Sequence, residues 1–237
     1  MSRLAARQSP LGTIAQTLPR LGRVLGNLRP TWHLDSLDAL DDAFVARHAI
    51  RAILWDVDGT LTTFHGPEVA PPARRFLALC RHPGLRHAIL SNAGEARYRE
   101  LGTIFPEIPV LKGYRVAGEV AMRELRHGRD SWPAERVAEV VAGGGVPLRK
   151  PDGELVRAAA NLLEVDLLGV VMVGDQYLTD IAGANLAGAR SIKLAAIAPE
   201  TLPPGIRAGQ VVERLLYRLL HGRPIVEGEA TPRVETR

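Results

Sequence analysis

The chain has little cysteine and little aromatic character. Cys80 is the one cysteine in 237 residues, so no disulfide can form within the chain, and the composition suits a reducing compartment. Aromatic residues make up 5% of the sequence. That scarcity argues against the stacking platform that single-stranded nucleic acid requires, so no nucleic-acid partner is expected. No apolar run reaches the length that spans a bilayer either.

The bulk composition is that of an ordinary globular protein. Hydrophobic residues account for 46% of the chain and charged residues for 24%. A chain of 237 residues can bury a sizeable core in one domain, with room for an appendage. The formal net charge of +4 suits anionic partners without choosing among them.

Two carboxylates stand close together at the end of an apolar run. Asp56 and Asp58 follow Ala52–Trp55, and if that run is a buried strand, alternation turns both carboxylates to the same side. Gly59 then allows a sharp turn. Two solvated aspartates would be the plain structural explanation, but parallel carboxylates beside a turn also make a metal and phosphate site.

Three further apolar runs also end in polar residues with useful chemistry. They are followed in turn by Ser91 and Asn92, by Lys150, and by Gly174 and Asp175, with Asp180 shortly beyond. Ser91 could equally cap a helix, and Lys150 could lie on the surface before a proline turn. Because open α/β sheets bind ligands at the carboxyl ends of their strands, we expect the four strand ends to meet in one site.

These motifs, in this order, resemble those of the haloacid dehalogenase (HAD) superfamily of phosphatases. They are Asp-Val-Asp-Gly-Thr-Leu-Thr at 56–62, Ser-Asn at 91–92, Lys-Pro at 150–151 and Gly-Asp-Gln-Tyr-Leu-Thr-Asp at 174–180. Lys112 is a rival third-motif lysine but lacks the following proline. The stretch from Val173 to Gly188 is similar to subclass IIIA phosphatases, which include the phosphatidylglycerol phosphate phosphatases. Gly59 is a departure, since that subgroup usually carries asparagine there.

The resemblance implies a two-step phosphatase mechanism that uses Mg²⁺. Asp56 is expected to attack phosphorus as the nucleophile, and Asp58 to protonate the leaving alkoxide and then activate water. The implied metal ligands are the Asp56 and Asp175 carboxylates and the Asp58 backbone carbonyl. Zinc is not expected, because no His and Cys residues cluster with ligand spacing.

The other polar residues are expected to bind the phosphate or to support the site. Ser91, Asn92 and Lys150 are the expected phosphate-binding residues, with the Asn92 backbone N–H near a helix start. Asp180 is expected to orient Lys150 or a metal-bound water. The supporting residues are Gly59, Thr60, Gly174 and Asp180.

Alternating apolar runs and helical patterns predict an α/β fold, a Rossmann-like doubly wound parallel sheet. Strands are predicted near 52–55, 87–90, 146–149, 170–173 and 190–194, and helices near 71–81, 94–104, 153–164 and 178–187. The 35 residues from Asp56 to Ser91 (91 − 56) leave no room for a large cap domain. We therefore expect a small or absent cap and an open site, and open sites in this superfamily usually take large substrates.

A HAD-like phosphatase domain is predicted at 49–222, with an insertion near 107–148 and a disordered tail at 223–237. Within the insertion, Val116, Val120 and Leu125 suggest one helix and 132–141 another, forming a small cap or an enlarged sheet connection. A helix over 211–220 is expected to pack its apolar stripe on the sheet.

Residues 1–48 read as a basic amphipathic extension. Five arginines and no acid precede Asp35, and leucine or isoleucine recurs every three or four residues over 11–28. Such a segment can lie on an anionic membrane, dock on the protein's own core, trail as a loose tail or act as a mitochondrial targeting peptide. The expected location is the cytoplasm, peripheral to the membrane, or the mitochondrial matrix if the segment is a targeting peptide.

The sequence thus leads to one main hypothesis and two rivals. The main one is a Mg²⁺-dependent phosphate monoester hydrolase acting on a phospholipid head group such as phosphatidylglycerol phosphate. A phosphatase of a soluble sugar phosphate or nucleotide is the first rival, because the first motif resembles sugar-acid phosphatases equally well. A catalytically idle binding scaffold is the second. Intact Asp56, Asp58, Lys150 and Asp175 argue against it, since a pure binder needs no such cluster of like charges.

Overall fold

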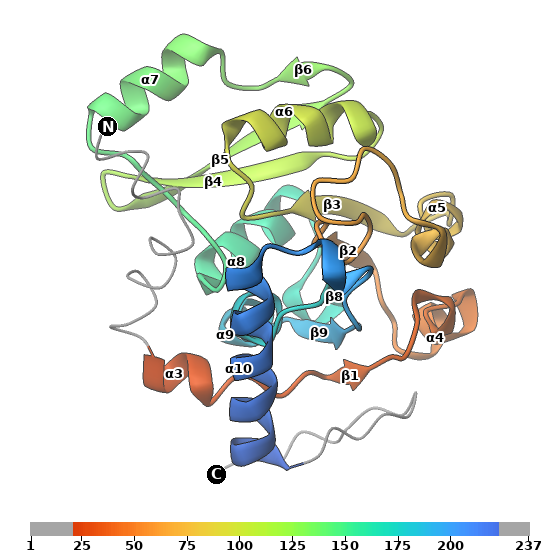
Figure 1. Ribbon diagram of the computed structural model, residues 1–237. Coiled ribbons are helices and arrows are strands. Elements are labelled where there is room, and N and C mark those ends of the chain that lie inside the picture. The colour runs from red at the N-terminus through yellow and green to blue at the C-terminus, as the bar shows by residue number, and fades with distance from the viewer. Residues whose placement is uncertain (1–20, 223–237) are drawn as a thin grey trace.

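The computed structural model describes residues 21–222 of the chain. The tail predicted at 223–237 and the first twenty residues of the N-terminal extension lie outside the described residues. The strands form one sheet in the order β1-β9-β8-β2-β3-β4-β5-β6, with β7 beside β4 (Figure 1). They are β1 (Trp32–His33), β2 (Ala52–Trp55), β3 (Arg86–Leu90), β4 (Val110–Val116), β5 (Glu119–Arg126), β6 (Arg129–Asp130), β7 (Val146–Pro147), β8 (Val170–Gly174) and β9 (Arg190–Lys193).

Most of the sheet is parallel. The run from β1 through β9, β8, β2 and β3 to β4 is parallel throughout, whereas β5, β6 and β7 are antiparallel to their neighbours. The predicted α/β fold with a doubly wound parallel sheet is confirmed. From β2 the chain moves to β3 and β4 on one side and later returns to β8 and β9 on the other. Such a reversal opens a crevice at the carboxyl ends of the strands, where ligands bind.

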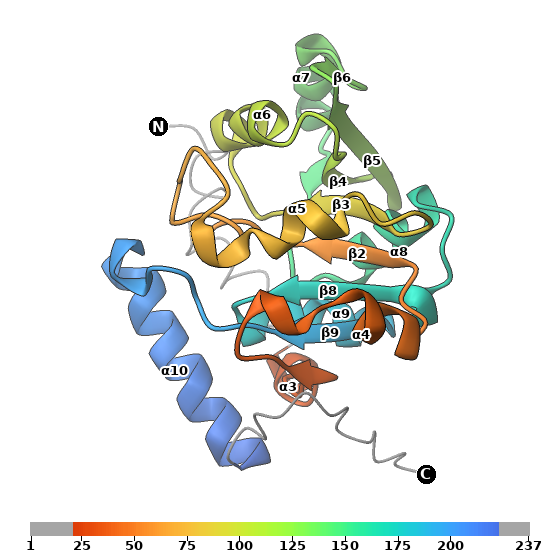
Figure 2. The same cartoon turned by 90° about the vertical axis from the view of Figure 1, so that its right-hand side faces the viewer.

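Helices cover both faces of the sheet (Figure 2). In β2, Ile53 and Trp55 face one apolar layer and Ala52 and Leu54 face the other, as strand alternation requires. The first face carries α4 (Asp42–Arg47), α5 (Arg75–Leu79) and α6 (Glu95–Ile104), and the second carries α8 (Gly153–Leu162) and α9 (Ala182–Ala187).

The four helices predicted near 71–81, 94–104, 153–164 and 178–187 are present, and the predicted strands agree with the structure except around 146–149. There β7 covers only Val146–Pro147 and pairs antiparallel with β4, outside the parallel part of the sheet. Proline cannot donate to a strand ladder, so the strand ends at Pro147. Two predicted helices have irregular first turns, a 3₁₀ turn at Pro71–Ala73 before α5 and a π turn at Tyr177–Ile181 before α9.

The segment 107–148 adds a hairpin and a helix to the sheet. The helix suggested by Val116, Val120 and Leu125 is wrong, because β4 and β5 form a long antiparallel hairpin there. Ala117 and Gly118 both have positive φ, 49° and 91°, and they make the two-residue turn that a tight hairpin requires. The second suggested helix is present as α7 (Ala134–Ala142), with Gly143 as its C-cap.

Residues 21–48 pack on the sheet. β1 pairs with β9 at the sheet edge, and Trp32 is buried in the core. Val24 and Leu28, in and after α3 (Leu21–Leu25), are buried against Tyr177 and Ile181. The predicted boundary at 48/49 therefore falls inside one packed unit.

The last helix, α10 (Pro204–His221), turns its polar side inward. It stands at the edge where the parallel strands end (Figure 2). Gln210, Glu213 and Tyr217 are its buried residues, whereas apolar positions such as Leu215 and Leu219 are exposed. The expectation that the apolar stripe packs on the sheet is wrong, because polar contacts orient this helix. No helix within 21–222 is long and apolar enough to cross a membrane.

Candidate active site

The strand-end residues meet at one edge of the sheet. β8, β2 and β3 are neighbours, and Asp175, Asp56 and Ser91 lie at or just beyond their carboxyl ends. Lys150 reaches the same place from the loop between β7 and α8. The predicted acid, hydroxyl and amine are thus brought together by the order of the strands.

Lys150 lies between two carboxylates. Its ammonium nitrogen is 2.6 Å from Asp56 Oδ1 and 2.6 Å from Asp180 Oδ1, and its side chain is only 2% exposed. Burial lowers the pKa of Lys150, but the two carboxylates outweigh burial and raise it well above its usual value. Asp180 also accepts the Gln176 backbone N–H at 3.1 Å, which fixes its orientation. The contact with Lys150 is one of the two roles expected for Asp180.

Asp56 and Asp175 are acids buried side by side. Asp56 Oδ2 accepts a hydrogen bond from the Thr60 hydroxyl at 3.3 Å. Burial raises the pKa of Asp56 to about 7, against the opposing charge of Lys150. Burial, with the charges of Asp56 and Asp180, raises the pKa of Asp175 well above its ordinary value. Neighbouring buried carboxylates of this kind favour a bound cation.

The residues fit a divalent metal ion. Carboxylate oxygens of Asp56, Asp175 and Asp180 lie within 4.8 Å of one another. Asp175 Oδ2 accepts from Gln210 at 2.7 Å, but its Oδ1 is buried with no hydrogen-bond partner among the described residues. An all-oxygen set suits Mg²⁺, and Asp56 and Asp175 would hold it. When bound, the ion would neutralise negative charge on a phosphoryl group.

Two glycines let the motifs approach closely. Gly59 has φ +93°, and a Cβ there would lie 2.9 Å from Asp175 Oδ2. A Cβ on Gly174 would lie 2.3 Å from the Asp180 carboxyl group. Gly174 therefore packs directly against the Asp180 side chain.

Asp58 is held by an arginine that the sequence did not single out. Its Oδ1 lies 2.7 Å from Arg97 Nη2 and accepts the His65 backbone N–H at 3.0 Å. Arg97 is buried in α6 and also donates to the Gly66 carbonyl at 3.0 Å. No local motif could have revealed this contact, since Arg97 reads as one of several charged residues on a helix.

Asn92 joins the second motif to the third. Its side-chain amide donates to the Lys150 carbonyl at 3.0 Å, and its Oδ1 accepts the Lys150 backbone N–H at 2.8 Å. The Asn92 side chain therefore positions Lys150. Ser91 lines a pocket beside this contact.

Helix α10 supplies two further residues that the sequence did not single out. Gln210 contacts Asp175, and Glu213 accepts the Tyr177 backbone N–H at 2.9 Å. Burial raises the pKa of Glu213 to about 7. These two contacts explain why the polar side of α10 faces the sheet.

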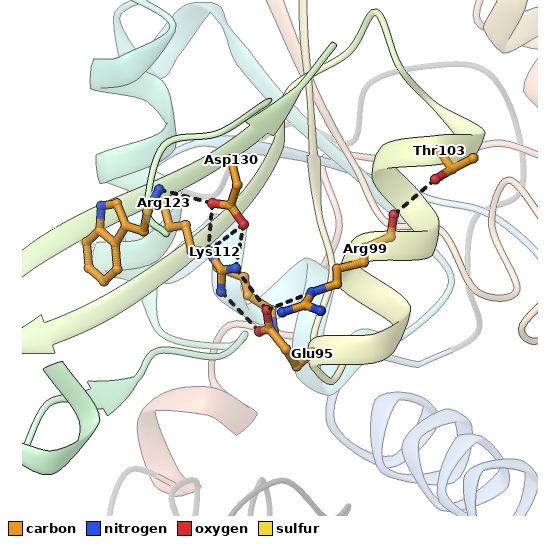
Figure 3. Close-up of polar contacts among 7 residues, drawn as sticks. Glu95, Arg99, Thr103, Lys112, Arg123 and Asp130 are labelled. Carbon is orange, nitrogen blue, oxygen red and sulfur yellow. Dashed lines mark hydrogen bonds and ion pairs between the residues drawn. The ribbon is translucent and has the colours of Figure 1, made fainter. Parts of the chain in front are cut away.

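A second charged cluster lies beside the site (Figure 3). Arg123 of β5 donates to Glu95 at 2.8 and 3.0 Å and to Asp130 at 2.9 Å. Lys112 Nζ lies 3.5 Å from the same Glu95, and Arg99 Nε lies 3.7 Å from it. Lys112, the rival third-motif lysine, thus pairs with Glu95, and Lys150 is the lysine that reaches Asp56.

Replacing Arg123 should destabilise the fold. The Arg123 side chain is 1% exposed, so Arg123→Met leaves Glu95 and Asp130 without their main cation. Losing one partner of a fully buried pair costs about 3–5 kcal/mol, and the partial exposure of both acids reduces the expected loss to about 2 kcal/mol. Urea denaturation measures it, with exposed Arg129→Met as the control. Equal unfolding midpoints for the two variants would contradict the prediction.

Comparison with known proteins agrees with this geometry. Residues 147–196 match a family described as HAD-hydrolase-like. The chain is 29% identical to a plasmid phosphoglycolate phosphatase of Cupriavidus necator over 76% of this chain and 63% of that protein. It is 29% identical to a phosphoserine phosphatase of Thermus thermophilus over 63% of this chain and 51% of that protein. The chain therefore spans less than two thirds of either relative.

The chain is also similar to a solved structure. It is a crystal structure of an uncharacterized protein from Listeria monocytogenes serotype 4b, with a TM-score of 0.41 and 21% identity over 71% of this chain and 99% of that one. The family match and the two phosphatase relatives agree with the resemblance of the strand-end motifs to HAD-like phosphatases.

Proposed function

We propose that this protein hydrolyses phosphate monoesters through an aspartyl-phosphate formed on Asp56. The observation that carries the proposal is the buried Asp56 carboxylate, held at 2.6 Å by Lys150 beside the unpartnered Asp175 oxygen. An Asp56 oxygen bonds to phosphorus as the bond to the leaving alkoxide breaks. Asp58 donates a proton to that alkoxide, then accepts one from the water that releases phosphate and restores Asp56.

The surrounding residues act by holding charge and position. Lys150 neutralises negative charge at Asp56 and on the phosphoryl group, and Asp180 holds Lys150 in place. Arg97 positions Asp58. We assign the binding of a phosphate oxygen to Ser91 and the Asn92 backbone N–H. Mg²⁺ at Asp56 and Asp175 would complete the neutralisation.

Phosphate release across a panel of phospholipids, sugar phosphates, phosphorylated acids and nucleotides tests the proposal. Each substrate is assayed with Mg²⁺ and with EDTA. Turnover that requires Mg²⁺ and an intact Asp56 is the expected result. Absence of release from every class, by a folded protein saturated with Mg²⁺, would reject the proposal and favour the binding scaffold.

For the substrate, a phospholipid head group such as phosphatidylglycerol phosphate is our leading candidate. The resemblance of 173–188 to subclass IIIA supports it, and so does the exposed side of α10. That side presents Val211, Val212, Leu215, Leu219 and Leu220. Arg207, Arg214 and Arg218 lie along one flank, and the one acid of the helix, Glu213, is buried. An apolar face beside arginines suits the surface of an anionic membrane.

The membrane prediction can be tested on α10 directly. Leu215→Ser with Leu219→Ser should weaken binding to phosphatidylglycerol-containing vesicles, measured by co-sedimentation, about 100-fold or more, because burying leucine stabilises binding by about 1.5 kcal/mol or more per side chain. Leu168→Ser is the matched control, since Leu168 is 73% exposed and lies outside α10. A chain starting at Leu21 tests residues 1–20 separately. Binding that equals the control, or that is indifferent to anionic lipid, would exclude α10 as the contact.

A soluble phosphorylated acid is the second candidate. The two curated relatives are named for phosphoglycolate and phosphoserine, and both of those substrates carry a carboxylate. If such compounds are turned over preferentially in the panel, the substrate is a soluble phosphorylated acid and not a lipid. The proposed mechanism would be unchanged.

A further inference from the structure

A pocket of about 250 Å³ lies next to the phosphate-binding residues. Its lining includes Ser91, Asn92, Lys112, Tyr114, Val141 and Arg149. Ser91 and Asn92 therefore border both the proposed phosphate site and this pocket. A group attached to a phosphate held at Ser91 can extend into it.

Arg149 faces this pocket with no side-chain partner. Among the described residues, no hydrogen bond or ion pair engages its guanidinium, although Arg97 and Arg123 nearby are both paired. Burial lowers the pKa of Arg149, and no neighbouring acid offsets the effect. A half-buried guanidinium with unused donors is suited to bind a carboxylate or phosphate.

Lys112 adds a second positive charge to the pocket. Its one acidic partner in the described part of the chain, Glu95, is shared with Arg123 and Arg99 (Figure 3). Burial lowers the pKa of Lys112, and the charge of Arg149 adds to that lowering. Within residues 21–222, the cations Arg99, Lys112 and Arg123 share the carboxylates Glu95 and Asp130, and Arg149 adds a further positive charge beside them. Positive charge therefore exceeds negative charge in this cluster.

Arg149 is also fixed relative to the catalytic lysine. It precedes Lys150, whose backbone is clamped by the two Asn92 hydrogen bonds. The pocket wall from α7 is apolar, with Val137 and Val141. A second anionic group on a substrate would therefore contact Arg149 and Lys112 at the polar end of the pocket.

We infer that Arg149 and Lys112 bind a second anionic group, a carboxylate or a phosphodiester, carried by the leaving alcohol of the substrate. This inference rests on the proposed function and narrows its substrate class to phosphate monoesters with a second negative group. The Arg149 guanidinium distinguishes these substrates from neutral-alcohol monoesters, and it takes no part in the proton or phosphoryl transfers.

The test compares substrates that differ only in that charge. Phosphoglycolate and ethyl phosphate are assayed with wild type, Arg149→Gln, Lys112→Gln and exposed Arg74→Gln as the control. Arg149→Gln should lower kcat/KM for phosphoglycolate about 10- to 100-fold, mainly through KM, since it removes a hydrogen bond between charged groups. Ethyl phosphate turnover should stay within about twofold, because that substrate never contacts Arg149. Lys112→Gln should act in the same direction.

A short-chain phosphatidylglycerol phosphate forms a further arm and separates the two sources of the anion. If Arg149→Gln lowers kcat/KM more for the lipid than for phosphoglycolate, the phosphodiester is the natural second group. If it lowers kcat/KM more for phosphoglycolate, the natural second group is a carboxylate. An equal loss on ethyl phosphate and phosphoglycolate would overturn the inference, because Arg149 would then act through Lys150. Absence of any loss would overturn it as well.

Calorimetry with phosphonoacetate and ethylphosphonate, which cannot be hydrolysed as monoesters, separates this inference from the proposed function. Tighter binding of phosphonoacetate that disappears in Arg149→Gln supports the second anion site even if no substrate turns over. In that outcome the proposed phosphatase activity fails while the binding site stands. Equal binding of the two compounds by wild type would reject the site.

Discussion

Asp56→Asn should abolish phosphate release, with a loss in kcat of about 10⁴-fold or more. An amide does not form the acyl phosphate, so the covalent route is closed. The fold should survive, because the change is nearly isosteric and removes one charge from the buried trio Asp56, Asp175 and Asp180. Steady-state phosphate release measures the loss, and circular dichroism with a thermal melt checks the fold.

Trapping of the intermediate supplies a second readout. Acid-quenched wild type should carry label from a radioactive substrate, and hydroxylamine should remove it, whereas Asp56→Asn should carry none. Asp166→Asn, an exposed aspartate away from the site, serves as the control and should keep full activity. A folded Asp56→Asn variant that retains a tenth of wild-type turnover would exclude Asp56 as the nucleophile.

Asp175→Asn should raise the Mg²⁺ concentration for half-maximal activity by at least about 100-fold. Outer-shell changes already cost about 10- to 100-fold in metal affinity, and this change removes a buried charge whose Oδ1 has no protein partner in the described chain. The metal-free variant should melt no lower than wild type. Burial and the charges of Asp56 and Asp180 raise the pKa of Asp175 and so disfavour its ionised form, and asparagine carries no charge there. Mg²⁺ titration of activity and of melting temperature measures both effects.

Gln210→Leu provides a graded comparison. It keeps the Asp175 carboxylate and removes only the 2.7 Å hydrogen bond to Oδ2, so its Mg²⁺ midpoint should rise by about tenfold, at the lower end of the range for outer-shell changes. Mg²⁺ should also raise the melting temperature of wild type but not that of Asp175→Asn. If the titration curve of Asp175→Asn coincides with that of wild type, Asp175 does not bind the metal.

The sequence by itself determined the central strands of the sheet and the edge at which the candidate site lies. Apolar runs at 52–55, 87–90 and 170–173 are the buried strands β2, β3 and β8. In a parallel sheet the carboxyl ends of such strands share one edge, so residues that follow them must lie near one another. The meeting of Asp56 with Asp175 was therefore predictable from local pattern and chain order.

Only the tertiary structure decided which residues hold the side chains of Asp58 and Asp175 in place. Arg97 is 39 positions from Asp58, and Gln210 is 35 positions from Asp175. No spacing rule links residues that far apart, because their contact depends on how whole helices pack. The orientation of α10 likewise could not be predicted from its local sequence pattern. Its apolar stripe predicted burial, but two polar contacts, Gln210 with Asp175 and Glu213 with the Tyr177 N–H, orient the helix the other way.

The hairpin at 110–126 shows how a local pattern can mislead. Val116, Val120 and Leu125 fit a helical period, yet the two positive-φ residues at the turn and the open edge of β4 select strands. Hydrogen bonding of β5 to β4 is a tertiary contact, and it outweighs the helical spacing of apolar residues in a short segment. That pairing also brings Arg123 and Lys112 beside Glu95, so the charge of the neighbouring pocket is a product of the fold and not of any motif.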